Sequence, residues 1–195
     1  GIARRVKAGE TLGGVGESGC GKSTLGKAIM GLVPVTSGKI HFESERGKVE
    51  LSGLSRRAYR PYRSEIQMVY QDPFSSLNPR LSVQEIVEEP LKVHQTHMSS
   101  EERRLRVEEL LEKVGLRREQ AERYPHEFSG GQRQRIGIAR SLATNPRVII
   151  ADEPVSALDV SIQAQVINLM RSLQRELDLT IVFIAHDISV VQHVS

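Results

Sequence analysis

The sequence predicts an α/β protein in which a parallel β-sheet is flanked by helices and carries an all-helical insertion. Short apolar runs alternate with helix-like segments along residues 1–80 and 146–195, which predicts the parallel sheet. A glycine-rich loop stands between the first apolar run and the first helix. Residues 81–145 show helical patterning alone, which predicts the insertion. A chain of 195 residues is long enough for one domain of this kind.

The part before the insertion is expected to contain three strands and a helix. In chain order these are a strand at 11–15, a helix at 21–30, a strand at 39–42 and a strand at 66–70. The helix ends before Gly31 and Pro34, since both residue types stop helices. Segment 44–63 is polar and rich in turn residues, and Ser55 can cap a short helix within it.

Capping signals mark two helices of the insertion. Ser82 with Glu85, and Ser99 with Glu102, fit the capping box in which both residues satisfy N–H groups at a helix start. Apolar residues of the second helix recur at helical spacing, at Val107, Leu110, Leu111 and Val114. These positions predict an amphipathic helix that packs on the rest of the insertion.

Charge spacing and a glycine complete this second helix. Glu109 and Lys113 lie four residues apart, so we expect an ion pair between them. Gly115 is expected to end the helix.

A third helix of the insertion begins unusually, in the stretch FSGGQRQR. Ser129 and Gln132 fit a capping box, and the helix is expected to run to Ala143. Between them stand Gly130 and Gly131, although a glycine costs up to about 1 kcal/mol relative to alanine in a helix. The two glycines therefore need a reason beyond helix formation.

The chain after the insertion returns to the alternating pattern. The expected elements are a strand at 148–151, an amphipathic helix through 162–173, a strand at 180–185 and a helix from 188 to 194.

The glycine-rich loop GESGCGKS matches the phosphate-binding pattern G-x-x-x-x-G-K-[ST] and stands between a strand and a helix. Glycines let backbone N–H groups surround phosphates, and the helix N-terminus adds partial positive charge. Lys22 is suited to the β- and γ-phosphates and Ser23 to Mg²⁺. Cys20 is a small residue at a variable position of this loop. The expected nucleotide-binding residues here are Gly16, Glu17, Ser18, Gly19, Cys20, Gly21, Lys22, Ser23 and Thr24.

Two acids end the apolar strand VIIADE. A buried parallel strand presents its carboxyl end where open α/β sheets bind ligands. Asp152 is suited to Mg²⁺, directly or through water, and Glu153 to a general base that orients the attacking water. An apolar strand followed by two acids is a weak motif by itself, and it becomes a strong one when a phosphate loop precedes it in the sequence.

Three further polar residues follow strand ends or lie just beyond one. Gln71 follows the strand at 66–70, His186 follows the strand at 180–185, and Asp159 lies in SALD after the acids. Each alone could be an ordinary loop residue. Their common placement with the phosphate loop and the acids favours a shared functional site.

Composition excludes several classes of function. The net charge of +3 is scattered, and aromatic residues make up 4% with no tryptophan, so a nucleic-acid surface is not expected. One cysteine cannot form an internal disulfide, which fits a reducing cytosol. No apolar run approaches a membrane span and no signal peptide begins the chain, so a role at a membrane would need a partner.

His94 and His97 could suggest a metal site. They are interpreted as surface residues, because the sequence offers no third metal ligand beside them.

The ordered set GESGCGKST, Gln71, FSGGQ, VIIADEP, SALD and His186 resembles the nucleotide-binding subunit of ATP-binding cassette (ABC) transporters. The resemblance runs from about residue 9 to the last residue. The stretches VYQDPFSSLNPR and RYPHEFSGGQRQRIGIAR look most like the ATPase subunits of bacterial oligopeptide and dipeptide importers. Related importers of nickel, glutathione and other small solutes look similar, so the cargo stays open among them.

The resemblance implies an ATP- and Mg²⁺-dependent ATPase with a P-loop NTPase (RecA-like) core and an ABC-type helical subdomain. It implies that two subunits pair head to tail, so that the signature residues face the nucleotide of the other subunit. These residues are Ser129, Gly130, Gly131 and Gln132, with Asp159 as a further nucleotide contact. It also implies catalytic roles for Glu153, His186 and Gln71, and Mg²⁺ contacts from Ser23, Gln71 and Asp152.

The implied partners are a second ATPase subunit, transmembrane permease subunits and, indirectly, a solute-binding protein. The implied location is the cytoplasmic face of the plasma membrane. The family has an adenine-stacking aromatic residue upstream of the phosphate loop and more strands at the end. We therefore expect residues 1–195 to be a fragment of one ABC ATPase domain, truncated at both ends, with a core at 1–80 and 146–195 and a helical subdomain at 81–145.

Three other classes fit the sequence less well. ABC-type ATPases that act on DNA or ribosomes usually separate the two nucleotide motifs by long coiled-coil or zinc insertions, and this chain has no cysteine pairs. A small-molecule kinase with a phosphate loop would leave FSGGQ and SALD unexplained, and a GTPase would carry an N-K-x-D motif, which is absent.

Overall fold

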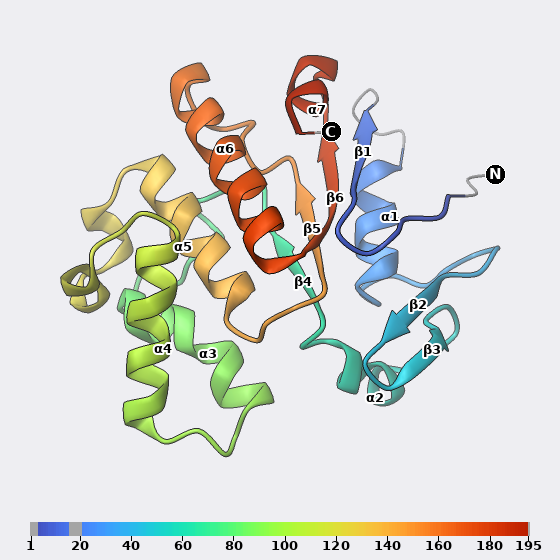
Figure 1. Cartoon of the computed structure of the whole chain (residues 1–195), viewed down its shortest axis with the longest axis horizontal. Coiled ribbons are helices and arrows are strands. Elements are labelled where there is room, and N and C mark those ends of the chain that lie inside the picture. The colour runs from blue at the N-terminus through green and yellow to red at the C-terminus, as the bar shows by residue number, and fades with distance from the viewer. Residues whose placement is uncertain (1–3, 16–20, 195) are drawn as a thin grey trace.

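A computed structural model describes residues 4–15 and 21–194 of the chain (Figure 1). A parallel sheet lies at the centre, with helices on both faces and a helical region at one side. The elements are β1 (Thr11–Val15), α1 (Lys22–Ile29), β2 (His41–Ser44), β3 (Gly47–Glu50), α2 (Arg56–Tyr59), β4 (Ile66–Val69), α3 (Val83–His94), α4 (Ser100–Lys113), α5 (Gly130–Leu142), β5 (Val148–Asp152), α6 (Val160–Leu177), β6 (Thr180–Ala185) and α7 (Ile188–Val194). Short 3₁₀ helices lie at Arg60–Tyr62, Arg118–Glu122 and Pro125–Glu127.

The main sheet has the strand order β1-β6-β5-β4, and all of its neighbouring strands are parallel. The register pairs Val15 with Ala185 and Asp152 with Ile184, so the carboxyl ends of these strands lie at one edge. The segments that follow β4, β5 and β6 therefore leave the sheet on the same side, where β1 also ends (Figure 1). This is the edge at which the sequence predicts the functional site.

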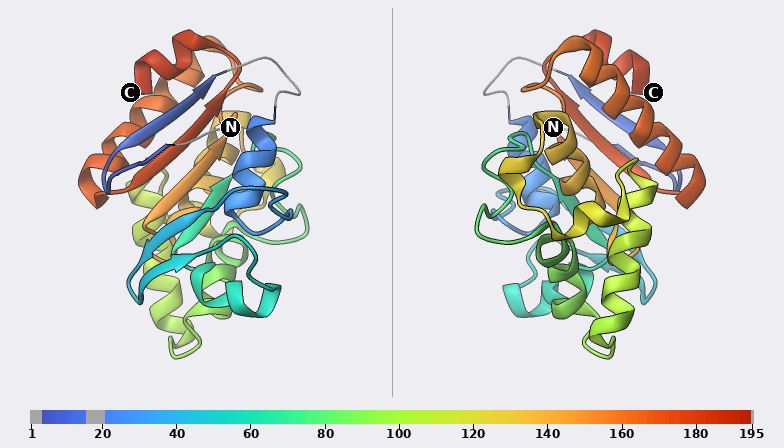
Figure 2. Two further views of the ribbon diagram at one scale, coloured as in Figure 1. Left: turned by 90° about the vertical axis from the view of Figure 1, so that its right-hand side faces the viewer. Right: turned by 90° about the vertical axis from the view of Figure 1, so that its left-hand side faces the viewer.

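The two faces of the sheet belong to different hydrophobic clusters. Ile150 and Ile184 pack with the α1 side, where a Cβ on Gly26 would lie 3.1 and 3.2 Å from their side chains. Their neighbours Ile149 and Phe183 join the larger cluster with residues of α3, α4, α5 and α6. Successive residues of a strand point to opposite faces, so the apolar residues of β5 and β6 are covered on both sides (Figure 2).

One strand was not expected from the sequence. β2 begins two residues later than predicted, and β3 lies within the segment read as polar and turn-rich. The two strands form an antiparallel hairpin in which Phe42 lies opposite Val49. Most other hairpin residues are exposed, so the apolar alternation that identifies strands is short here. The predicted short helix is present as α2, and the Ser55 hydroxyl accepts a hydrogen bond from the Ala58 N–H.

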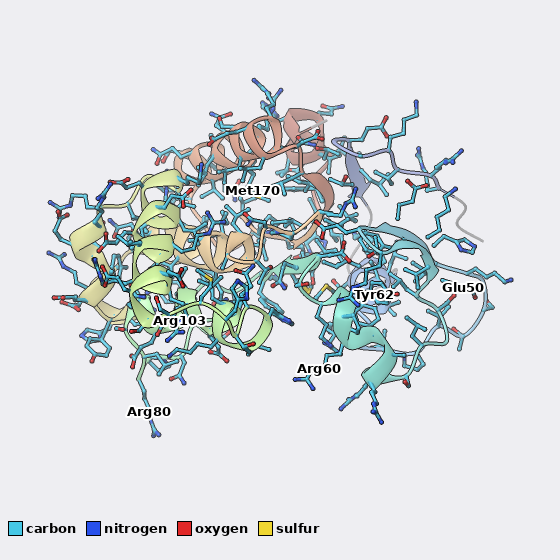
Figure 3. All side chains as sticks on the ribbon, turned by 60° about the horizontal axis from the view of Figure 1, so that its bottom comes forward. Glu50, Arg60, Tyr62, Arg80, Arg103 and Met170 are labelled. Carbon is cyan, nitrogen blue, oxygen red and sulfur yellow. The ribbon has the colours of Figure 1, made fainter. Side chains whose placement is uncertain are left out.

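The helical insertion has the predicted helices and caps. Both predicted capping boxes are present, at the starts of α3 and α4. These two helices are joined by Glu88, which lies 2.8 Å from Lys92 Nζ and accepts a hydrogen bond of 3.3 Å from Arg103 Nε. Figure 3 labels Arg103 in this helical region. Gly115 has the positive φ, 80°, that a helix-ending glycine allows.

The predicted ion pair between Glu109 and Lys113 is wrong. Lys113 Nζ instead contacts Glu176 of α6 at 2.7 Å, and Arg106 contacts Glu109 at 3.0 Å. The stabilisation that exposed ion pairs contribute differs by less than about 1 kcal/mol, so a partner on another helix easily replaces the one on the same helix.

None of the helices in the part of the chain that the structure describes has the length and apolar character needed to span a membrane.

Candidate functional site

Four strands end at the carboxyl edge of the sheet, and most of the predicted site residues follow these strand ends in the sequence. The loop after β1 leads into α1, which begins with Lys22, Ser23 and Thr24. Gly21 precedes them with a φ of 91°, a left-handed conformation that glycine adopts without strain. The predicted nucleotide contacts Gly16, Glu17, Ser18, Gly19 and Cys20 lie outside the described residues.

The start of α1 and the end of β5 meet directly. Ser23 Oγ donates a hydrogen bond of 3.0 Å to Asp152 Oδ1, across 129 residues of sequence. Asp152 is buried with 9% of its surface exposed, so its carboxylate is fixed beside the helix N-terminus. The sequence predicted that both residues contact Mg²⁺, and the fold places a hydroxyl and a carboxylate where they could share one cation.

Glu153 is buried, with 6% of its surface exposed, and lies beside His186 at the end of β6. His186 Nε2 lies 2.5 Å from Glu153 Oε1, and the imidazole side chain is 45% exposed. Glu153 has a φ of 47°, a conformation that costs a non-glycine residue about 1–3 kcal/mol. Its N–H donates a 2.7 Å hydrogen bond to Ile184 O, which keeps this strained residue against the sheet. The predicted base and the predicted histidine are thus in contact.

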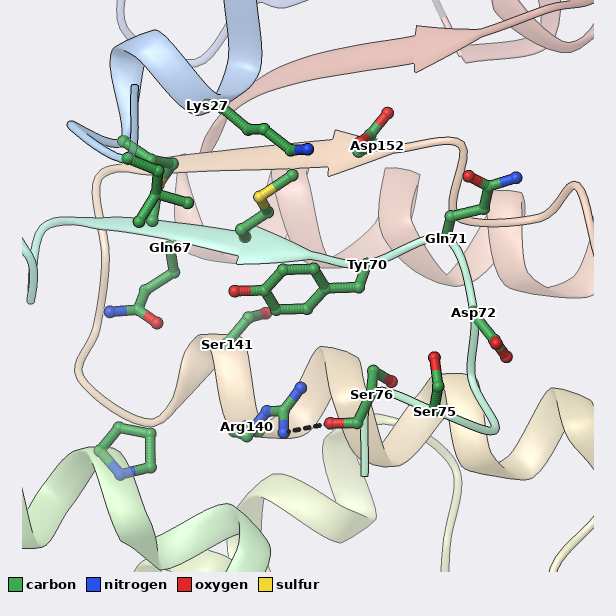
Figure 4. Close-up of a pocket in the computed structure, with 14 residues that line it drawn as sticks. Lys27, Gln67, Tyr70, Gln71, Asp72, Ser75, Ser76, Arg140, Ser141 and Asp152 are labelled. Carbon is green, nitrogen blue, oxygen red and sulfur yellow. Dashed lines mark hydrogen bonds between the residues drawn. The ribbon is translucent and has the colours of Figure 1, made fainter. Parts of the chain in front are cut away.

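Gln71 follows β4 and is exposed, and it lines a cavity of about 660 Å³ together with Asp152 (Figure 4). The cavity extends from the strand ends along the segment after β4 to Arg140 of α5. Arg140 donates a 2.9 Å hydrogen bond to Ser76 O in this segment. Burial lowers the pKa of the Arg140 guanidinium below its ordinary value.

The start of α5 is the FSGGQ stretch, and its capping box is present. Ser129 Oγ accepts a 3.3 Å hydrogen bond from the Gln132 N–H, and Gln132 Oε1 accepts one of 3.0 Å from the Ser129 N–H. A Cβ on Gly131 would lie 2.6 Å from Ile162 Cγ2 of α6. One glycine of the pair therefore has a packing reason, namely the close approach of α5 and α6.

Gly131→Ala is expected to destabilise the fold by about 1 kcal/mol, because overpacking of about 1–3 kcal/mol exceeds the helix propensity gained. The Ile162 side chain is β-branched, so its Cγ2 atom has little freedom to move away from a new methyl group. Urea unfolding at equal m-values measures the change. In an Ile162→Ala background, the same substitution is expected to be neutral or stabilising.

Gly130→Ala is the matched control. Its Cβ would meet Leu158 at 3.4 Å and the Phe74 ring at 3.5 Å, which are ordinary contacts. A loss of stability equal to that of Gly131→Ala would show that packing on Ile162 is not the cause.

The start of α5 does not meet the start of α1. The two helix N-termini lie at opposite sides of the sheet's carboxyl edge in Figure 1. Asp159 belongs to another helix start. It is the exposed residue before α6, and its side chain makes no capping hydrogen bond. The chain thus brings Ser23, Asp152, Glu153 and His186 into pairs and leaves the signature stretch separate.

The residues at the sheet edge fit Mg²⁺ bound mainly through phosphates. Oxygen atoms of Ser23, Asp152 and Gln71 are the hard ligands that this ion prefers. Within residues 4–15 and 21–194, no cluster of three or more His, Cys, Asp or Glu side chains could hold a metal. Mg²⁺ commonly uses one or two protein ligands with substrate phosphates and water, so a dedicated cage is not needed.

Sequence reasoning missed three α5 side chains that contact the edge of the site. Gln134 donates hydrogen bonds to Tyr70 O and Pro154 O, Arg140 donates to Ser76 O, and Arg133 lies over the Phe74 ring. Helical periodicity could have indicated Gln134, since it lies one turn before Ile138 on the buried face. A buried polar side chain needs hydrogen-bond partners, and the partners of Gln134 are backbone carbonyls that follow β4 and β5.

The fold and its loops have the architecture of a P-loop NTPase core with a helical insertion. Comparison with known families and structures narrows this class. Residues 1–156 match the family described as "ABC transporter", and the chain belongs to this family.

Curated relatives are strongly similar along the whole chain. The oligopeptide transport ATP-binding protein OppF of Escherichia coli (strain K12) is 56% identical over 195 residues, which are 100% of this chain and 57% of the relative. The oligopeptide transport ATP-binding protein AppF of Bacillus subtilis (strain 168) is 58% identical over 196 residues, with 100% and 58% covered. The chain therefore spans a little over half the length of these relatives.

Solved structures of ATP-binding cassettes have folds similar to that of this chain. The ATP-binding cassette MJ0796, in a dimeric post-hydrolysis state bound to ADP and Pi, is 35% identical with a TM-score of 0.84. The similarity covers 97% of this chain and 80% of MJ0796. CbiO1 of Clostridium perfringens, described as part of an ABC transporter complex, is 31% identical with a TM-score of 0.83, covering 98% of this chain and 72% of CbiO1.

Proposed function

We propose that this chain binds and hydrolyses ATP to power the import of peptides, as the ATPase subunit of a bacterial ABC transporter of the oligopeptide and dipeptide class. The observation that carries the proposal is the Ser23–Asp152 hydrogen bond of 3.0 Å, which joins the helix after the phosphate loop to the acid-ending strand. The names of relatives such as OppF and AppF support the transported class.

The chain's own residues suit the roles predicted for them. Lys22 at the start of α1 would neutralise the β- and γ-phosphates, aided by the helix N-terminus. Ser23, Asp152 and Gln71 would hold Mg²⁺, which when bound neutralises charge that develops on the phosphates. Glu153 would orient and deprotonate the attacking water, and His186 would fix the Glu153 carboxylate through their contact.

The partners follow from the separate position of the signature stretch. We propose that Ser129, Gly130, Gly131, Gln132 and Asp159 contact a nucleotide held by a second ATPase subunit, as the dimeric state of MJ0796 supports. Permease subunits would supply the membrane path, and a solute-binding protein would deliver the peptide.

The chain would lie at the cytoplasmic face of the plasma membrane. Residues 1–80 and 146–195 would form the nucleotide-binding core, and 81–145 the helical subdomain.

Lys22→Ala is expected to weaken MgATP binding by at least tenfold, because Lys22 offsets phosphate charge already in the ground state. Equilibrium binding of a fluorescent ATP analogue to the purified protein measures the effect. Lys48→Ala is the control, since Lys48 is exposed on β3 and pairs with Glu43 at 3.5 Å. Unchanged affinity in Lys22→Ala would contradict the phosphate-loop assignment.

A further inference from the structure

A buried amide of α5 connects two of the loops at the site. Gln134 is 1% exposed, and its Nε2 donates hydrogen bonds to Tyr70 O at 3.1 Å and to Pro154 O at 2.6 Å. Tyr70 ends the segment from β4 and directly precedes Gln71. Pro154 directly follows Glu153. One side-chain nitrogen therefore links the chain beside Gln71 to the chain beside Glu153.

The chemistry of the amide fixes its orientation. An amide NH₂ group has two N–H donors, and here two backbone carbonyls accept them. The reversed amide would place Gln134 Oε1 against both carbonyl oxygens, which have no proton to donate. Neither methionine nor glutamate at this position could make both bonds, although both have nearly the same length and shape as glutamine.

The link falls where the backbone is strained. Glu153 has a φ of 47°, and its N–H is bonded to Ile184 O at 2.7 Å on the sheet side. On the other side, the next residue along the chain is bonded to Gln134. A strained conformation persists only where its surroundings hold it, so loss of the second bond would allow the Glu153 turn to relax. The carboxylate would then leave its present position beside His186.

Two arginine side chains of α5 contact the segment after β4. Arg133 lies 4.5 Å from the centroid of the Phe74 ring, and Arg140 donates to Ser76 O at 2.9 Å. Gln134 contacts this segment and also the turn after β5. Because α5 begins with the signature stretch, any shift of this helix would move both loops together.

We propose that Gln134 is a positioning residue for ATP hydrolysis. Its amide holds the backbone beside Gln71 and the backbone beside Glu153 at fixed positions relative to each other and to α5. This role rests on the proposed ATPase function. It predicts an effect on the catalytic step rather than on nucleotide binding, because neither bonded carbonyl belongs to the phosphate loop or to α1.

The test measures kcat and KM for ATP, nucleotide affinity and thermal unfolding in Gln134→Met and Gln134→Glu. Both variants are expected to lower kcat about 10–100-fold, since a misplacement of about 1 Å costs about 10²-fold, while affinity changes less than about threefold. Adding Gln134→Met to Glu153→Gln is expected to cause little further loss, because residues that act as a unit are not additive. If one variant fails to fold, the other is judged by the same criteria.

Gln174→Met is the matched control. Gln174 Nε2 also donates to a backbone carbonyl, Gly9 O at 3.2 Å, but at the opposite edge of the sheet. Its loss is expected to lower stability and leave kcat within about twofold of the wild type. Wild-type kcat in a folded Gln134 variant, or an equal kcat loss in Gln174→Met, would overturn the positioning role and leave the proposed function standing. Absence of ATP hydrolysis by the wild-type protein would overturn both.

Discussion

Glu153→Gln is expected to reduce ATP hydrolysis by about 10²–10⁴-fold and to leave ATP binding intact. Glutamine keeps the shape of the side chain, and its amide can still contact His186, but it cannot accept a proton from water. The position is buried directly after β5, so the substitution removes the carboxylate that contacts His186 without exposing a new surface group. Single-turnover hydrolysis and binding of a fluorescent ATP analogue measure the two effects separately.

A second buried glutamate provides the control for this substitution. Glu65 is 8% exposed and accepts hydrogen bonds from Ser44 Oγ at 2.6 Å and from the Glu45 N–H at 2.8 Å, away from the strand ends of the site. Glu65→Gln is expected to lower stability and to keep the hydrolysis rate. Near-normal turnover by Glu153→Gln would reject the general-base role, whatever the control shows.

The central sheet could be predicted because its strands are buried on both faces. Strands such as β5 and β6 read as continuous apolar runs, and their carboxyl ends are marked by the acids and by His186. Parallel pairing then places these ends at one edge without further information. The contacts between Ser23 and Asp152 and between Glu153 and His186 are consequences of this topology.

The features that were missed depend on weak or tertiary contacts. The β2–β3 hairpin buries little apolar surface, so its sequence resembles a polar loop. Lys113 contacts Glu176 of α6, and residue spacing along α4 carries no information about a partner on another helix. The role of Gln134 depends on two backbone carbonyls, which have no side-chain signature in the sequence.

The second large effect concerns the signature stretch. Ser129 is exposed at the start of α5, apart from the start of α1 within one chain. If the two helix N-termini serve one nucleotide, they must come from two subunits. Each dimer then has two composite sites, and each site uses Lys22 from one subunit and Ser129 from the other. Lys22→Ala and Ser129→Arg should therefore inactivate alone and complement each other when mixed.

Random exchange of the two variants yields mixed dimers with one intact site of two, so about a quarter of wild-type ATPase activity is expected. Neither variant alone should approach this level, because every composite site is then damaged. Ser99→Arg controls for loss of a capping box, since Ser99 caps α4 with Glu102 and is expected to leave hydrolysis nearly unchanged. If each chain kept its own site, both sites of a mixed dimer would be damaged and mixing would restore nothing. The shared site would also be contradicted by a wild-type monomer, identified by sedimentation with MgATP, that keeps full specific activity at every dilution.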